Sequence, residues 1–87
     1  MLEVVSIRDV KVQLGNLVKK LRKKEGLSQV ELADLLGLSR ITVQNLESGQ
    51  NFTIDTLLKV VHHFNLLEEL NRTINQKIND TSINPLY

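Results

Sequence analysis

Apolar residues recur at intervals of three and four along most of the chain, which is the spacing of one face of an α-helix. Valine, leucine and isoleucine supply most of them, whereas aromatic residues make up 3% of the sequence. Pro85 is the only proline, so no proline interrupts a helix before that position. The pattern therefore predicts an all-α protein. Its four glycines are Gly15, Gly26, Gly37 and Gly49.

The first predicted helix runs from a cap at Asp9 to about Lys24, and Gly26 ends it. Its apolar stripe consists of Val10, Leu14, Leu17, Val18 and Leu21. Gly15 lies inside this helix, where glycine costs about 1 kcal/mol relative to alanine. Either another backbone packs close to Gly15 or the helix is weak at that turn. Residues 2–8 carry several β-branched side chains and no cap, which leaves an extended segment or a short N-terminal strand open.

A capping box predicts where the second helix begins, because the Ser28 hydroxyl can accept from the Glu31 amide while the Glu31 carboxylate reaches back. Gly37 ends that helix after about two turns. Ser39 offers the cap of a third helix over residues 40–47. Thr53 can cap a fourth helix that ends near residue 65, and a fifth runs from Leu66 or Leu67 to about Lys77.

Two short helices joined by a turn of three or four residues form the layout of a helix-turn-helix, whose second helix enters the DNA major groove. With Val43 and Leu46 turned inward, the third helix presents mostly polar side chains, namely Arg40, Ile41, Thr42, Gln44 and Asn45. Arginine pairs with guanine, asparagine and glutamine pair with adenine, and isoleucine or threonine methyls contact thymine. These residue types favour base reading. The alternatives are that Thr42 only supports the start of its helix and that Gln44 faces solvent.

The segment from Leu17 to Leu66 resembles the phage-repressor type (Xre/Cro-like) helix-turn-helix family, above all over LSQVELADLLGLSRITVQNLESGQ (27–50). The matching parts are Leu21-Arg22, SQxxLA from Ser28 to Ala33, Gly37, Ser39-Arg40 and LExG from Leu46 to Gly49. The resemblance implies a five-helix, lambda-repressor-like DNA-binding domain. It also implies a homodimer acting on operator DNA with pseudo-twofold symmetry.

The resemblance places the five outward residues of the third helix at the base-reading positions of the family. It further implies contacts to the DNA backbone from residues at the two ends of the motif, Ser28, Gln29, Gln50 and Asn51. For Gln29, the family position contacts either a phosphate or the first base. The alternative for residues 50–51 is a plain turn. The first helix adds candidates for phosphate contacts, namely Lys19, Lys23 and Lys24.

Arg22 and Glu47 match a pair of positions that forms a partly buried ion pair in the family. We expect this pair to be structural and to tie the first helix to the end of the third. The alternative is that Arg22 reaches a phosphate directly.

Charge is unevenly distributed, although the net charge of the chain is only +1. Residues 1–26 contain seven Lys/Arg against three Asp/Glu (+4), residues 27–66 two against four (−2), and residues 67–87 two against three (−1). A solvated helix end explains such a basic cluster as well as a binding site does. Beside a DNA-reading helix, however, the positive charge gains a partner.

The composition argues against several classes of protein. The chain has no cysteine, which excludes disulfides and thiolate zinc sites and fits a reducing, cytoplasmic compartment. No apolar run approaches the roughly 18 residues of a membrane span, and the N-terminus lacks a signal-peptide profile. His62 and His63 are adjacent, so on a helix they point about 100° apart and cannot chelate one metal together. We expect neither an enzyme nor a cofactor.

The sequence divides into an N-terminal extension (1–9), a helix-turn-helix domain (10–66), a C-terminal helix (67–78) and a flexible tail (79–87). One small domain can hardly bury the apolar stripe near its end, so we expect a homodimer interface at Leu66, Leu67, Leu70 and Ile74. The predicted function is sequence-specific binding of double-stranded DNA by a transcriptional repressor. The alternative is the antitoxin of a toxin–antitoxin pair, which binds a toxin protein and regulates its own operon.

Overall fold

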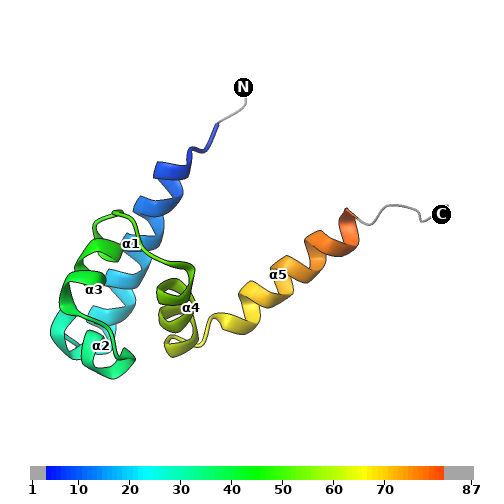
Figure 1. The fold of residues 1–87 in the computed structure, drawn as a ribbon. Coiled ribbons are helices and arrows are strands. Elements are labelled where there is room, and N and C mark those ends of the chain that lie inside the picture. The colour runs from blue at the N-terminus through cyan, green and yellow to red at the C-terminus, as the bar shows by residue number, and fades with distance from the viewer. Residues whose placement is uncertain (1–3, 82–87) are drawn as a thin grey trace.

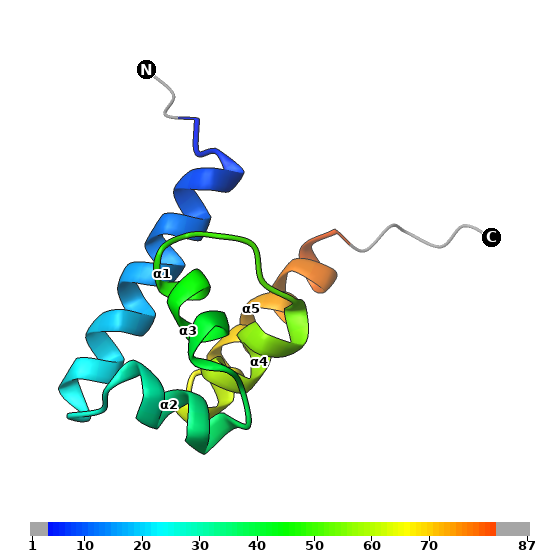
Figure 2. The same cartoon turned by 60° about the vertical axis from the view of Figure 1, so that its left-hand side comes forward.

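The structure is a computed structural model that describes residues 4–81. Its elements are α1 (Ile7–Lys24), α2 (Gln29–Leu36), α3 (Arg40–Glu47), α4 (Ile54–His63) and α5 (Leu67–Asp80). The first four helices form a bundle, and α5 extends away from it (Figures 1 and 2). The prediction of an all-α, five-helix domain is confirmed, and residues 4–81 contain no strand.

The start of α1 differs from the sequence prediction. Ser6, not Asp9, is the N-cap: its hydroxyl accepts from the Asp9 amide at 3.0 Å, and the Asp9 carboxylate accepts from the Ser6 amide at 3.0 Å. The hydrogen bond from that amide lowers the pKa of the Asp9 carboxyl. Ile7 and Arg8 are therefore helical, because the cap outweighs the β-branched preference of this segment. Residues 1–3 of the expected extension lie outside the described part of the chain.

The far end of the chain also differs from the prediction. Helix α5 continues to Asp80, three residues beyond the expected end at Lys77. Asn79 and Asp80 are thus helical, although we expected a flexible tail from residue 79 onward. Residues 82–87 of that tail lie outside the described chain.

Helix α3 lies at the centre of the bundle and packs against both α1 and α2. Val43 and Leu46 are fully buried, as the inward face required. The residues of the core come from the first four helices and the C-cap of α4, and they are Val18, Leu32, Ala33, Val43, Leu46, Val60 and Phe64. The outer face of α3 therefore has a fixed orientation, because its inner face fills the core.

The turn between α2 and α3 is short and tightly bonded. Gly37 adopts the left-handed conformation (φ +67°), and the Leu38 amide donates to the Ala33 carbonyl at 2.8 Å. Ser39 then caps α3 by accepting from the Thr42 amide at 3.1 Å. Only three residues separate the two helices, so their relative angle is set within this turn.

Gly15 lies where the backbone of α3 crosses α1. A Cβ atom at this position would stand 2.5 Å from the Glu47 carbonyl oxygen and 2.7 Å from that of Leu46. Of the two explanations for this glycine, the close approach of another backbone is therefore correct. Glycine is required because any side chain would push α3 away from α1.

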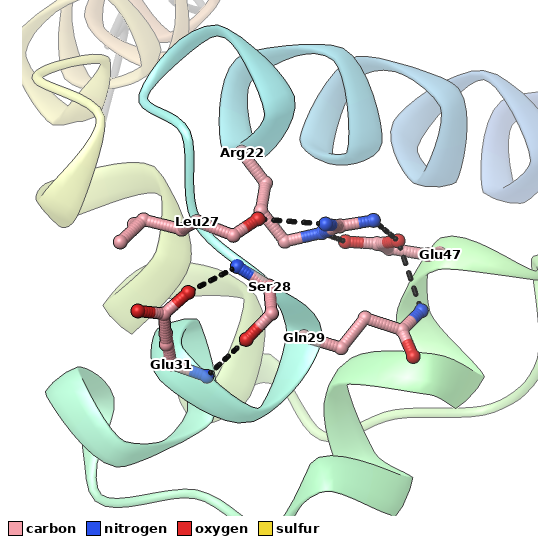
Figure 3. Close-up of polar contacts among 6 residues, drawn as sticks. All are labelled: Arg22, Leu27, Ser28, Gln29, Glu31 and Glu47. Atoms are coloured by element: carbon pink, nitrogen blue, oxygen red, sulfur yellow. Dashed lines mark hydrogen bonds and ion pairs between the residues drawn. The ribbon is translucent and has the colours of Figure 1, made fainter.

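Arg22 of α1 and Glu47 of α3 form a buried ion pair (Figure 3). Arg22 Nε donates to Glu47 Oε2 at 2.6 Å and Nη2 donates to Oε1 at 2.9 Å. Nη1 donates to the Leu27 carbonyl at 2.8 Å. The hydrogen bond to Glu47 raises the pKa of Arg22 against the opposing effect of burial. All three guanidinium nitrogens thus have protein partners, which favours the structural role of Arg22.

We predict that Gly15→Ala destabilises the protein by about 1–3 kcal/mol, because overpacking against rigid backbone outweighs the gain in helix propensity. Asn16→Ala is the matched control, since residue 16 is exposed on the same helix. Urea unfolding measures both variants. A Gly15→Ala protein more stable than the parent would contradict the close approach.

We predict that Glu47→Ala costs about 3–5 kcal/mol of folding free energy, because it leaves the buried guanidinium of Arg22 without its partner. Glu68→Ala removes an exposed ion pair with Arg72, whose atoms are 3.8 Å apart, and should change stability by under about 1 kcal/mol. Thermal melts compare the two variants. Equal melting temperatures would mean that the buried pair is not structural.

Candidate nucleic-acid interface

The outer face of α3 carries the residues that the sequence predicts to read bases. Arg40, Ile41 and Gln44 are exposed. Ile41 is 63% exposed although its side chain is apolar. Asn45 is half-buried on the same helix. A helix of eight residues with a core-filling inner face and this outer set fits the width of a DNA major groove.

Thr42 has a local partner. Its hydroxyl lies 2.8 Å from the hydroxyl of Ser39, the residue that caps α3, and the side chain is half-buried. This geometry favours the alternative role for Thr42, support of the helix start. Its methyl group is the part that remains for a base contact.

Gln29 connects α2 to the end of α3. Its Nε2 donates to Glu47 Oε1 at 3.1 Å, and the same oxygen accepts from Arg22 (Figure 3). The bond to Glu47 uses one of the two amide hydrogens, so the side chain keeps donor capacity for a phosphate while its position is fixed. Ser28 is exposed, and its hydroxyl accepts from the Glu31 amide at 3.0 Å as the N-cap of α2.

The segment after α3 is attached to the last turn of that helix. The Gln50 amide donates to the Asn45 carbonyl at 2.8 Å, and the Ser48 hydroxyl donates to the same carbonyl at 3.2 Å. Gln50 and Asn51 are both exposed. The two predicted backbone-contact residues therefore lie directly beyond the end of α3.

Asn51 also meets a residue that the sequence analysis missed. Lys11 Nζ donates to Asn51 Oδ1 at 2.6 Å, across 40 positions of the chain. A sequence signal for Lys11 existed, because it lies four residues before Gly15 and seven before Val18. Those spacings put it on the side of α1 that faces α3.

The predicted lysines of α1 are exposed but do not share one side of the helix. Lys19 and Lys23 follow Val12 by seven and eleven residues, so all three lie on one side. Val12 contacts the segment after α3, since its Cγ2 would be 3.3 Å from a Cβ at Gly49. Lys24 points about 120° away from this side. The structure thus brings Lys19 and Lys23, but not Lys24, to the side of α1 that meets this segment.

The expected dimer residues lie where α5 leaves the bundle. Leu66 packs against the core, whereas Leu67, Leu70 and Ile74 line an open groove between α4 and α5. None of the fourteen residues of α5 is buried.

Residues 4–81 contain no group of three or more His, Cys, Asp or Glu side chains placed to hold a metal ion. Within the same residues, no helix combines the length and apolarity needed to cross a membrane.

Several other proteins are similar in sequence to this chain. An HTH-type transcriptional regulatory protein of Methanocella arvoryzae is 44% identical over 46 residues, which are 53% of this chain and 14% of that protein. One of Pyrococcus furiosus is 39% identical over 51 residues, 58% of this chain and 16% of that protein. Antitoxin HipB of Escherichia coli is 34% identical over 55 residues, 62% of each. The chain spans less than two thirds of the length of each relative.

The family model described as Helix-turn-helix matches residues 18–74, which is more than half of the sequence. The match includes α2, α3 and the exposed residues of the candidate interface. The chain therefore belongs to the Xre/Cro-like helix-turn-helix family of DNA-binding transcriptional regulators.

Proposed function

We propose that this protein is a sequence-specific, double-stranded DNA-binding repressor that acts as a homodimer. The observation that carries the proposal is the outer face of α3, where Arg40, Ile41, Gln44 and Asn45 project from a helix whose inner face is locked in the core. In this proposal the four side chains read base edges, and Thr42 adds a methyl contact. Cytoplasmic DNA is the target, with no cofactor.

Contacts to phosphate supply affinity at both ends of the motif. Gln29 serves at the start of α2, where Glu47 fixes its position. Gln50 and Asn51 serve beyond α3, and Lys19 and Lys23 add charge from the neighbouring side of α1. Arg22 neutralises the buried Glu47 carboxylate, so that acid does not oppose the DNA.

The proposed dimer uses α5. Leu67 and Ile74 are 38% and 48% exposed, and Ile78 on the same stripe is 59% exposed. Isolated helices of this length are marginal in water, so covering the stripe with a second copy stabilises both the helix and the dimer. A twofold axis then places two α3 helices about 34 Å apart, one helical turn of DNA. Occupying such an operator blocks access to an overlapping promoter.

The second candidate is a DNA-binding antitoxin, which the similarity to HipB favours. In that case the DNA-reading face is the same, and a toxin protein is an additional partner. Selection of binding sites from a random duplex library separates the two candidates. Recovery of an inverted repeat by the protein alone supports the repressor, whereas a folded protein that enriches no sequence favours an antitoxin that needs its partner.

We predict that Asn45→Ala lowers affinity for the selected site by about 1–3 kcal/mol and relaxes base preference at one or two positions. Binding to unrelated duplexes should change less, because phosphate contacts remain. Thr73→Ala, an exposed substitution on α5, is the control. Fluorescence anisotropy with single-base variants of the site measures both proteins. An unchanged base preference would show that Asn45 does not read a base.

We predict that Ile74→Asp shifts the protein from dimer to monomer, because it puts a charge into the apolar stripe of α5. Gln76→Asp is the matched control, since residue 76 lies about 160° around the helix from residue 74 and is exposed. Sedimentation of both variants at equal concentration measures the fraction of dimer. A dimer that survives Ile74→Asp would place the interface elsewhere.

A further inference from the structure

We propose that Lys11 and Asn51 form a phosphate clamp, which extends the DNA contact from the end of α3 onto the N-terminal half of α1. This inference rests on the proposed function, because the phosphate belongs to the same duplex that α3 reads. It assigns a DNA contact to Lys11, which lies outside the matched family segment of residues 18–74.

The pair is well suited to hold an anion. Lys11 Nζ has three hydrogens and uses one for Asn51 Oδ1 at 2.6 Å. That bond holds the amide oxygen of Asn51 beside the ammonium group and leaves the NH₂ group of Asn51 to donate. Both side chains therefore retain donors, and the pair carries one full positive charge. A phosphate oxygen is an acceptor that can meet both residues.

The segment that carries Asn51 is held against α1 at a second point. Gly49 has φ +76°, and a Cβ there would lie 3.5 Å from the Val12 Cα and 3.6 Å from the Val12 nitrogen. Figure 2 shows this segment leaving α3 beside α1 before it crosses to α4. Two anchors at neighbouring α1 residues fix the segment, so the clamp is formed before DNA arrives and costs little ordering entropy on binding.

The charge of Lys11 remains available. None of the ion pairs among residues 4–81 includes it. The nearest acid along the helix is Asp9, which points about 160° away and caps α1 through Ser6. An amide partner orients the ammonium group without neutralising it. The whole charge is therefore left to release a counterion from DNA.

The position of the clamp relative to α3 also favours a phosphate contact. Asn51 follows Gln50, whose amide donates to the Asn45 carbonyl in the last turn of α3. When α3 lies in the major groove, the residues just beyond its end face one of the two backbones that border the groove. Lys11 contacts Asn51 from α1, so both side chains lie close to the same phosphate, next to the bases that α3 reads in the proposed function.

The test measures the salt dependence of DNA binding for Lys11→Met and Lys20→Met, using the full chain and one fixed duplex that carries its selected site. Lys20 is exposed on the same helix, about 180° around from Lys11. We expect the slope of log affinity against log salt to fall in magnitude by about 0.9 for Lys11→Met and to stay unchanged for Lys20→Met. The deficit of Lys11→Met is then about 3.5-fold larger at 50 mM salt than at 200 mM.

A second variant separates a phosphate clamp from a tether that only holds the structure together. Asn51→Asp keeps an acceptor for Lys11 and adds a negative charge toward the duplex. We expect unchanged or higher thermal stability together with weaker binding to every sequence. Unchanged DNA affinity in Asn51→Asp, or an unchanged slope in a folded Lys11→Met, overturns the clamp. Failure of the unaltered protein to bind any duplex overturns the proposed function instead.

Discussion

The carboxylate of Glu47 joins three helices at one point. It accepts two hydrogen bonds from Arg22 of α1 and one from Gln29 of α2, while its own backbone in α3 lies against Gly15. Such a site costs desolvation energy, which is offset only when the ion pair is well aligned and further hydrogen bonds reach the buried carboxylate. Because α3 carries the residues proposed to read DNA, the geometry of that reading depends on this single carboxylate.

The same arrangement assigns folding stability and the proposed DNA recognition to different side chains. Buried charge holds the helices together, whereas exposed polar side chains on the other side of α3 stay uncommitted to the fold. Each guanidinium nitrogen of Arg22 already has a protein partner, whereas Arg40 is exposed on the outer face of α3. The exposed residues on the outer face of α3 can therefore be substituted with little effect on the stability of the domain.

The two ends of the chain extend this core in different ways. The N-terminal half of α1 approaches the segment after α3 through Val12 and Lys11, and Lys11 adds positive charge beside the end of α3. Helix α5 extends away from the bundle (Figure 1), and its apolar stripe is only partly covered by α4. One end thus enlarges the proposed DNA contact, and the other offers a surface for a second copy.

Local chemistry in the sequence was enough to predict the five helices, the caps at Ser28, Ser39 and Thr53, and the turn at Gly37. Caps, glycine turns and helical periodicity act over a few residues, so they can be read directly from the order of the amino acids. The cap at Ser6 was missed because Asp9 can serve as a cap itself, although here it completes the capping box from the third helical position. The neighbour of Gly15, the partner of Gln29 and the pairing of Lys11 with Asn51 were decided only by the tertiary structure. These contacts join residues 18 to 40 positions apart, and they depend on how closely the helices cross, which no local pattern specifies.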